Sequence, residues 1–126
     1  MPALNDIMTR EVFTTAPGSP VAEVAARMLR SRVGSAVVTQ GSMLLGILTE
    51  RDVLRAAASG SDLTSSPVSE WMTQDPVTVE PETDADDAAE MMLSRGFRHL
   101  PVLQGGALAG IVSLRDILSI RILRPR

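Results

Sequence analysis

The chain repeats itself, and this repeat constrains its architecture before any single residue is considered. Residues 8–56 align with residues 72–120 at a constant offset of 64, and 16 of the 49 aligned positions are identical. The shared pieces include a Met-Thr, a Gly-Ile and an Arg-Asp pair: Met8-Thr9 and Met72-Thr73, Gly46-Ile47 and Gly110-Ile111, Arg51-Asp52 and Arg115-Asp116. A unit this small hardly buries a core by itself, so two copies predict one pseudo-symmetric globule. A cleft between the copies is the expected place for a ligand.

The composition limits the classes of protein to which the chain can belong. Its 126 residues suit one ordinary domain or two very small halves. No apolar stretch approaches the ~20 residues that cross a bilayer, and no basic region followed by an apolar run opens the chain, so we expect a cytoplasmic protein without a membrane partner. There is no cysteine, which excludes disulfides and thiolate zinc sites, and no lysine, which excludes a Schiff base. The net charge of −3 disfavours nucleic-acid binding.

The first helix of each copy follows from hydrophobic periodicity. Short β-prone pieces at residues 12–15 and 77–79 precede these helices. Apolar residues recur at i, i+3, i+4, i+7 and i+8, which predicts amphipathic helices along Val21, Val24, Ala25, Met28 and Leu29 and along Ala85, Ala88, Ala89, Met92 and Leu93. Ser19 is the predicted N-cap of the first helix, with Pro20 at its first position. Thr83 and Asp86 have the spacing of a capping box before the second.

Two short strands and a second helix complete each copy. The strands are predicted at residues 35–39 and 44–49, and at residues 100–104 and 108–113, with glycine-containing turns between them. Helices follow at residues 50–58 and 114–123. Each copy therefore has the order β-α-β-β-α, and the fold class is α+β. The predicted boundaries are residues 1–60 for the first repeat, 61–70 for a linker and 71–126 for the second repeat, together one integrated module.

The last predicted helix carries more apolar residues than one face can hold. Its leucines and isoleucines do not fit a single stripe: Leu114, Ile117, Leu118, Ile120, Ile122 and Leu123. A helix that is apolar nearly all round is usually buried on more than one side. This pattern favours either a homodimer interface or burial within the chain, and the sequence leaves both open.

The strand-to-helix junctions are the best candidates for a binding site. Thr49 ends a strand in the first copy and Asp52 follows three residues later, and Ser113 and Asp116 repeat this arrangement in the second. The first N–H groups of a helix suit an anion such as phosphate, and a carboxylate can hold a vicinal diol such as a ribose. The alternative is purely structural, because both pairs have the spacing of capping boxes.

These repeated segments together resemble a known family. The resemblance rests on the Met-Thr pairs, the two Gly-Ile-x-Thr/Ser-x-Arg-Asp segments, and Arg98-His99-Leu100-Pro101-Val102 with its counterpart Gly34-Ser35-Ala36-Val37-Val38. Essentially the whole chain is similar to a CBS-domain pair, or Bateman module, in its stand-alone tandem form. The resemblance implies two small sheets with helices packed about a pseudo-twofold axis. It also implies a regulatory role in signal transduction through AMP, ADP, ATP or S-adenosylmethionine, with no cofactor required.

The resemblance further implies two composite ligand-binding clefts. The first combines the Asp52 junction with residues of the second repeat: Ile47, Thr49, Arg51, Asp52, Thr78, Val79, Phe97, Arg98 and His99. The second combines the Asp116 junction with residues of the first repeat: Ile111, Ser113, Arg115, Asp116, Thr14, Thr15, Val33, Gly34 and Ser35. In each cleft the aspartate is expected to hold the ribose, the hydroxyl residue to approach the ribose or phosphate, and the isoleucine to lie near the base.

The two implied clefts differ in charge. Arg98 and His99 can pair with phosphate, whereas Gly34 and Ser35 stand at the matching positions of the other cleft, so phosphorylated ligands are predicted to prefer the Asp52 cleft. Arg51 and Arg115 either add charge to the clefts or simply solvate their helices.

Three functions compete at this point. An enzyme is disfavoured, because the chain has one histidine, no cysteine and no phosphate-binding loop motif, so no catalytic residue and no metal site is predicted. A nucleotide-sensing module that acts on an unidentified partner protein is favoured. The alternative is a ligand-free interaction or dimerisation module, although both copies keep an aspartate where a helix cap would also accept Ser, Asn or Glu. Trp71, the only tryptophan, is expected to pack the linker down.

Overall fold

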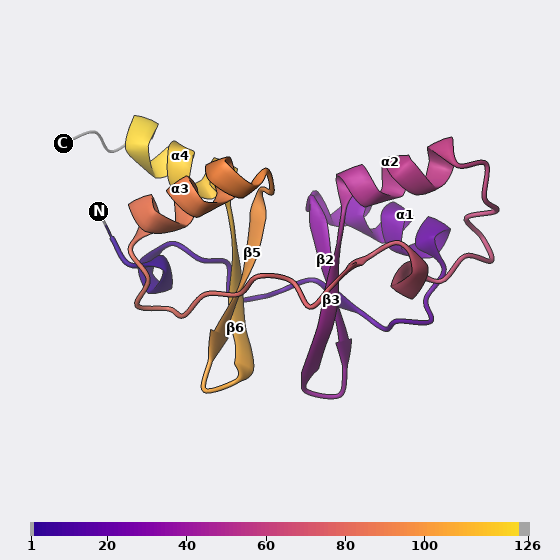
Figure 1. Ribbon diagram of the computed structural model, residues 1–126, viewed down its shortest axis with the longest axis horizontal. Coiled ribbons are helices and arrows are strands. Elements are labelled where there is room, and N and C mark those ends of the chain that lie inside the picture. The colour runs from indigo at the N-terminus through magenta and orange to yellow at the C-terminus, as the bar shows by residue number, and fades with distance from the viewer. Residues whose placement is uncertain (1, 124–126) are drawn as a thin grey trace. The chain divides into compact units, whose positions relative to one another are not determined.

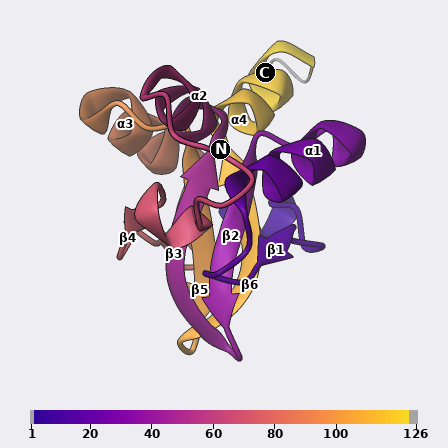
Figure 2. The ribbon, with the colours of Figure 1, turned by 90° about the vertical axis from the view of Figure 1, so that its right-hand side faces the viewer.

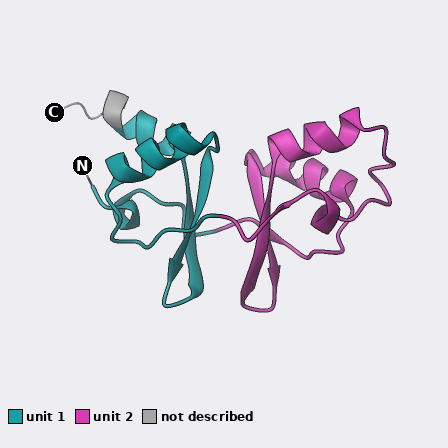
Figure 3. Cartoon of the chain, in the orientation of Figure 1, with its two compact units in different colours: residues 1–11, 77–126 teal, residues 12–76 magenta. Residues whose placement is uncertain are grey.

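The computed structural model describes residues 2–123 and divides the chain into two compact units (Figures 1 and 3). Unit 2 is the continuous stretch of residues 12–76. Unit 1 combines the residues up to 11 with those from 77 onward. Each unit therefore contains the helices and hairpin of one repeat, completed by the opening segment of the other repeat.

Unit 2 is built around a four-stranded sheet in the order β1-β2-β3-β4. β1 runs parallel to β2, and the other neighbours are antiparallel. The elements of this unit are β1 (Thr14–Thr15), α1 (Val21–Ser31), β2 (Ser35–Gln40), β3 (Met43–Thr49), α2 (Glu50–Ala58), the 3-10 helix η2 (Val68–Glu70) and β4 (Thr73–Gln74). Both helices lie toward the end of the β2–β3 hairpin that is remote from its turn (Figures 1 and 2).

Unit 1 follows the same plan with shorter outer strands. Its elements are the 3-10 helix η1 (Leu4–Asp6), α3 (Ala85–Arg95), β5 (His99–Gln104), β6 (Ala107–Ser113) and α4 (Leu114–Leu123). Single bridges replace the two outer strands: Val79 pairs with Val102 in parallel, and Thr9 pairs with Ile111 in antiparallel fashion. The two hairpins carry a register shift at the same place, between Val38 and Thr39 and between Val102 and Leu103.

Each unit has its own hydrophobic core, and both cores draw on both repeats. The core of unit 2 consists of Val21, Val24, Met28, Ala36, Val38, Leu48, Ala56 and Val68. The core of unit 1 consists of Leu4, Met8, Val79, Ala85, Ala88, Met92, Leu100, Val102, Val112 and Ile117. Trp71 and Met72 of the second repeat pack against the core of unit 2, and Leu4 and Met8 of the first repeat belong to the core of unit 1, so neither repeat completes its core alone.

The duplicated Met-Thr and Gly-Ile pairs prove to be contact partners. A Cβ atom on Gly46 would lie 2.6 Å from Met72 Sδ and 2.6 Å from the Thr73 carbonyl oxygen. A Cβ atom on Gly110 would lie 2.8 Å from Met8 Sδ and 2.8 Å from the Thr9 carbonyl oxygen. Glycine is therefore needed at this position of β3 and of β6, because only glycine lets the Met-Thr segment approach so closely.

Both amphipathic helices begin one residue later than the sequence predicts. Pro20, not Ser19, is the N-cap of α1, and the N–H groups of Val21 and Ala22 donate to the carbonyl oxygens of Ser66 and Leu63. A backbone segment thus supplies the acceptors that a Ser19 side chain was expected to supply.

The predicted capping box of Thr83 and Asp86 is also wrong. Asp84 is the N-cap of α3, and its carboxylate accepts from the N–H groups of Asp86 and Asp87. The Ala85 N–H donates to the carbonyl oxygen of Pro2, as Val21 does to Ser66 in the other unit.

The core-facing stripe of each amphipathic helix is narrower than predicted. Leu29 and Leu93 are 80% and 68% exposed, although both were expected on the apolar face. Within α4, Ile117 is buried and Leu118 is exposed, while the side chains of Ile122 and Leu123 lie outside the described residues. The predicted hairpin strands are confirmed to within one residue, but β1 covers only Thr14–Thr15 of the expected residues 12–15.

Candidate functional site

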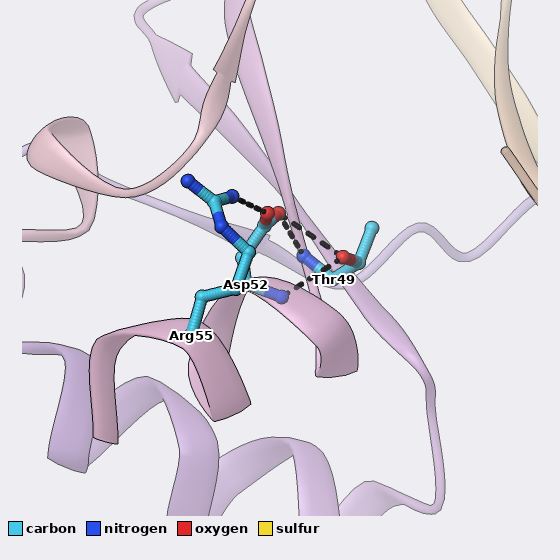
Figure 4. Close-up of polar contacts among 3 residues, drawn as sticks. All are labelled: Thr49, Asp52 and Arg55. Carbon is cyan, nitrogen blue, oxygen red and sulfur yellow. Dashed lines mark hydrogen bonds and ion pairs between the residues drawn. The ribbon is translucent and has the colours of Figure 1, made fainter. Parts of the chain in front are cut away.

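The junction of unit 2 is a capping box formed by Thr49 and Asp52 (Figure 4). β3 ends at Thr49, and α2 begins at the next residue. Asp52 Oδ2 accepts from the Thr49 backbone N–H at 2.9 Å and from the Thr49 hydroxyl at 3.0 Å. The Asp52 N–H donates in return to Thr49 Oγ1 at 3.3 Å. Thr49 and Asp52 therefore cap α2, the purely structural role that their spacing allowed. Such a cap contributes about 1 kcal/mol to helix stability.

The second oxygen of Asp52 is also engaged. Asp52 Oδ1 accepts from Arg55 Nη1 at 2.8 Å, which makes an ion pair one helical turn along α2 (Figure 4). The side chain of Asp52 is only 7% exposed, whereas that of Arg55 is 58% exposed. The carboxylate of Asp52 is thus buried beside Thr49 and Arg55, and the guanidinium of Arg55 stays largely in solvent.

The junction of unit 1 repeats the capping box without the ion pair. The Ser113 N–H donates to Asp116 Oδ2 at 3.1 Å, and the Asp116 N–H donates to Ser113 Oγ at 3.0 Å. Ser119 stands 64 residues after Arg55, so no arginine occupies the matching position. Asp116 is half-buried, and its Oδ1 makes no hydrogen bond to any described residue.

The helix N-termini offer an anion fewer free donors than the sequence suggested. In α2 the N–H of Glu50 donates to the Gly34 carbonyl oxygen, and in α4 the N–H of Leu114 donates to that of Arg98. The capping boxes also engage the N–H groups of Asp52 and Asp116. In the first turn of each helix this leaves the backbone N–H of Arg51 and of Arg115 without an acceptor among the described residues. Both arginine side chains are exposed.

The structure distributes the predicted site residues over both units. Unit 2 contains those numbered below 76: Thr14, Thr15, Val33, Gly34, Ser35, Ile47, Thr49, Arg51 and Asp52. Unit 1 contains the remainder: Thr78, Val79, Phe97, Arg98, His99, Ile111, Ser113, Arg115 and Asp116. Each implied cleft therefore takes residues from both units.

Within each unit the hairpin places a polar residue opposite the hydroxyl of the junction. Ser35 pairs with Thr49 across β2 and β3, and His99 pairs with Ser113 across β5 and β6. Ser35 is buried and His99 is half-buried. The strongest chemical difference between the two junctions, apart from Arg55, is therefore an imidazole in place of a hydroxyl.

Each implied cleft takes one wall from the repeat opposite its aspartate, and two of these predicted wall residues, Val79 and Thr15, lie on the helix-covered side of their sheets. Val79 belongs to the core of unit 1, beside its partner Val102. Thr15 occupies the matching place in unit 2, beside Val38, and is 6% exposed. Its hydroxyl is buried without a hydrogen-bond partner among the described residues. The neighbouring Thr14 is exposed and Thr78 is half-buried, and Arg98 of the same predicted set is exposed as well.

The surface of unit 1 is hollowed beside this wall. Two open depressions of about 400 and 490 Å³ share Thr78, Val79 and Glu80 in their linings. The first continues over Leu103, Gly105 and Gly106, and the second over Glu82, Thr83 and Met91. Neither includes a residue of the Ser113–Asp116 junction.

The family is settled by comparison with known proteins. The CBS domain model matches the chain twice, over residues 4–59 and 68–122. The chain belongs to the CBS-domain family. Among curated proteins, it is 41% identical over 116 residues to an uncharacterised 17.7 kDa protein of Acidianus ambivalens, covering 90% of this chain and 70% of that protein. It is 36% identical over 118 residues to the CBS domain-containing protein YhcV of Bacillus subtilis, covering 93% and 84%.

Solved structures agree with this assignment. A CBS-domain containing protein from Agrobacterium tumefaciens superimposes with a TM-score of 0.89 at 33% identity, covering 95% of this chain and 99% of that one. The structure is thus the α+β fold of a tandem CBS-domain pair. CBS-domain pairs are regulatory, and no catalytic family is indicated for this chain. Every helix in the described part of the chain is too short or too polar to cross a membrane.

Proposed function

We propose that this CBS-domain pair is a sensor that binds an adenosine-type ligand at its Thr49–Asp52 and Ser113–Asp116 junctions and thereby regulates a partner protein. One observation carries the proposal: in both units a hydroxyl residue that ends a hairpin strand forms a capping box with an aspartate three residues later. Asp116 Oδ1 has no hydrogen bond to a described residue, and a ribose hydroxyl would supply one.

The fold itself accommodates ligands of this chemical class. The CBS-domain pair of protein MJ0100 was crystallised with 5′-methylthioadenosine and S-adenosylmethionine. Its likeness to this chain, with a TM-score of 0.87 at 21% identity, is a likeness of fold. It therefore supports the ligand class in general and does not choose among AMP, ADP, ATP and S-adenosylmethionine.

Regulation requires that the ligand prefer one of two states of the protein. A ligand with equal affinity for both states shifts nothing, however tightly it binds. We propose a cytoplasmic location and a separate effector protein, and no catalytic step. The site chemistry requires no metal or organic cofactor, because hydrogen bonds to a diol and an adenine are sufficient for recognition.

The test is calorimetric titration of the purified chain with AMP, ADP, ATP and S-adenosylmethionine, together with Asp52→Ala and Asp116→Ala. Binding of one ligand that either variant weakens at least tenfold supports the sensor. The same titration tests whether phosphorylated ligands depend more on Asp52 than on Asp116. The proposal fails if none of the four ligands gives heat or raises the melting temperature.

A ligand-free dimerisation module is the second candidate, favoured by exposed leucines at matching positions. Leu54 on α2 and Leu118 on α4 stand 64 residues apart and are both exposed, as are Leu29 and Leu93 on α1 and α3. Exposed apolar residues mark an interface where they form a contiguous patch. Light scattering of the wild type against Leu54→Glu and Leu118→Glu distinguishes a homodimer from a monomer. A mass unchanged by either substitution removes these leucines from the interface.

A further inference from the structure

Arg55 connects the candidate ribose carboxylate to the only tryptophan of the chain. Its Nη1 atom donates to Asp52 Oδ1 at 2.8 Å, and its Cζ atom lies 5.8 Å from the centroid of the Trp71 ring. A guanidinium at that distance from an indole face is attracted by the ring electrons. One flexible side chain therefore contacts both groups at once.

The matching positions of unit 1 carry none of this arrangement. Ser119 stands where unit 2 has Arg55, and Ile7 stands where it has Trp71. Ile7 packs against the core of unit 1 as Trp71 packs against that of unit 2. The arginine, its ion pair and its aromatic partner are thus additions to one copy, and the repeated fold does not need them.

The exposures of the three groups determine which of them can move. Arg55 is 58% exposed, so its ion pair is screened by water and its guanidinium can leave at small cost. Asp52 is 7% exposed with Arg55 in place, and Arg55 is the one described residue that donates to its Oδ1 atom, so the departure of Arg55 leaves that atom in need of another donor. Trp71 Nε1 is buried without a hydrogen-bond partner among the described residues, so packing holds the ring in place.

A vicinal diol approaches a carboxylate with two hydroxyl donors, and both oxygens of Asp52 already accept hydrogen bonds from described residues. Oδ2 accepts twice from Thr49, and Oδ1 accepts from Arg55. The bond from the Thr49 N–H belongs to the helix cap and has a counterpart in unit 1, whereas the bond from the Thr49 hydroxyl is present in unit 2 alone among the described residues. The Arg55 bond is the one that a ligand can replace without opening the helix.

We propose that Arg55 is an internal competitor for the Asp52 carboxylate, displaced when a diol ligand binds, and that Trp71 reports its displacement. The inference rests on the proposed function, since it presumes that Asp52 accepts a diol. It makes the two junctions unequal: an uncharged nucleoside must displace Arg55 at Asp52, but meets no such competitor at Asp116. Arg55 is therefore a specificity-determining residue that acts through Asp52.

The test measures adenosine binding at one junction at a time. Asp116→Ala removes the second carboxylate, and adenosine affinity is compared by calorimetry between Asp116→Ala and Asp116→Ala/Arg55→Ser. We expect Arg55→Ser, which introduces the residue found at position 119, to raise the adenosine affinity about two- to fivefold. This factor corresponds to the free energy of a partly exposed ion pair. The gain should vanish with 2′-deoxyadenosine, which lacks the vicinal diol. A merely structural Arg55 would alter stability and leave this difference between the two nucleosides unchanged.

The mirror experiment uses the other copy. Ser119→Arg in an Asp52→Ala background introduces the competitor beside Asp116 and should weaken adenosine by a similar factor. Trp71 emission provides a measurement that needs no background substitution. Adenosine should change the emission of the wild type and of Ser119→Arg, and should leave that of Arg55→Ser unchanged.

The outcomes separate this inference from the proposed function. If Asp116→Ala binds adenosine and Arg55→Ser does not tighten it, the competitor is overturned and the sensor stands. If the emission of Arg55→Ser still responds to adenosine as the wild type does, the reporter role of Trp71 is overturned. If adenosine, AMP, ADP, ATP and S-adenosylmethionine bind to no variant and not to the wild type, the proposed function is overturned and the inference with it.

Discussion

Unit 1 and unit 2 share their backbone plan and differ in where they place polar groups. The shared features are the Met-Thr segment against a hairpin glycine, the register shift in the hairpin and the capping box at the junction. Two of the differences bear on polar groups: Thr15 against Val79, and Arg55 with Trp71 against Ser119 with Ile7. The glycine contacts and the capping boxes are thus kept in both copies, while other positions have diverged, core positions such as Val24 and Ala88 included.

The largest predicted effect tests the shared part of this comparison. Gly46→Ala and Gly110→Ala each place a Cβ atom against a backbone carbonyl that cannot move away, at 2.6 and 2.8 Å. We expect each to lower the free energy of unfolding by about 2–3 kcal/mol, as measured by urea denaturation. Gly18→Ala is the matched control, because no atom lies within 4 Å of its Cβ. A neutral Gly110→Ala would show that the two Met-Thr contacts are not equivalent.

The next effect measures how much more Asp52 contributes than Asp116. Both variants to alanine lose a capping box, but Asp52→Ala also loses the Thr49 hydroxyl bond and the Arg55 ion pair. We expect a loss of about 2 kcal/mol for Asp52→Ala and about 1 kcal/mol for Asp116→Ala in urea denaturation. Arg55→Ser serves as the control for the ion pair and should cost well under 1 kcal/mol. Equal losses for the two aspartates would remove this distinction between the junctions.

A smaller effect tests the buried hydroxyl of unit 2. Thr15 Oγ1 is buried without a partner among the described residues, and Val79 fills the matching place with a methyl group. Thr15→Val should raise the melting temperature, with a gain of about 1 kcal/mol, since it removes an unsatisfied polar atom and keeps the shape. Val79→Thr should lower the melting temperature by the reverse argument. A loss of stability in Thr15→Val would indicate that the hydroxyl has a partner in the native protein.

The smallest effect lies in the loop that caps α1. Hydrogen bonds from the Thr64 hydroxyl, and then from the Thr64 N–H, lower the pKa of Asp62 below its ordinary value. A lowered folded-state pKa contributes stability above the unfolded pKa, which is lost as the pH falls through the folded pKa. NMR titration of the Asp62 carboxyl should show the low pKa, and Thr64→Val should raise it toward the ordinary value. An unchanged pKa in Thr64→Val would assign the shift to another group.

Much of the fold was predictable because each repeat carries its own periodicity. Short apolar runs with glycine-containing turns between them placed the hairpin strands within one residue, and the hydroxyl and aspartate spacing located both capping boxes. The starts of α1 and α3 were not predictable, because residues 63–66 and Pro2 supply acceptors from far along the chain. The periodicity wrongly placed Leu29 and Leu93 on the apolar face, since an apolar residue at a helix end need not face the core.

The exchange of the opening segments could not be predicted for a more general reason. Met8 and Met72 are identical, as are Gly46 and Gly110, so no sequence feature decides which methionine contacts which glycine. The competitor Arg55 was missed for the opposite reason. It breaks the repeat, and the departure from Ser119 at a site one helical turn from an aspartate was the available signal.

The exchange also sets the order in which the two units can form during synthesis. Unit 2 is one uninterrupted stretch, so all of it is available once residue 76 has left the ribosome. Thr9 of unit 1 instead pairs with Ile111, about 100 residues later. At about 5–20 residues per second, the first segment of the chain waits roughly 5–20 seconds for its strand. Unit 2 can therefore fold while the second part of unit 1 is still being synthesised.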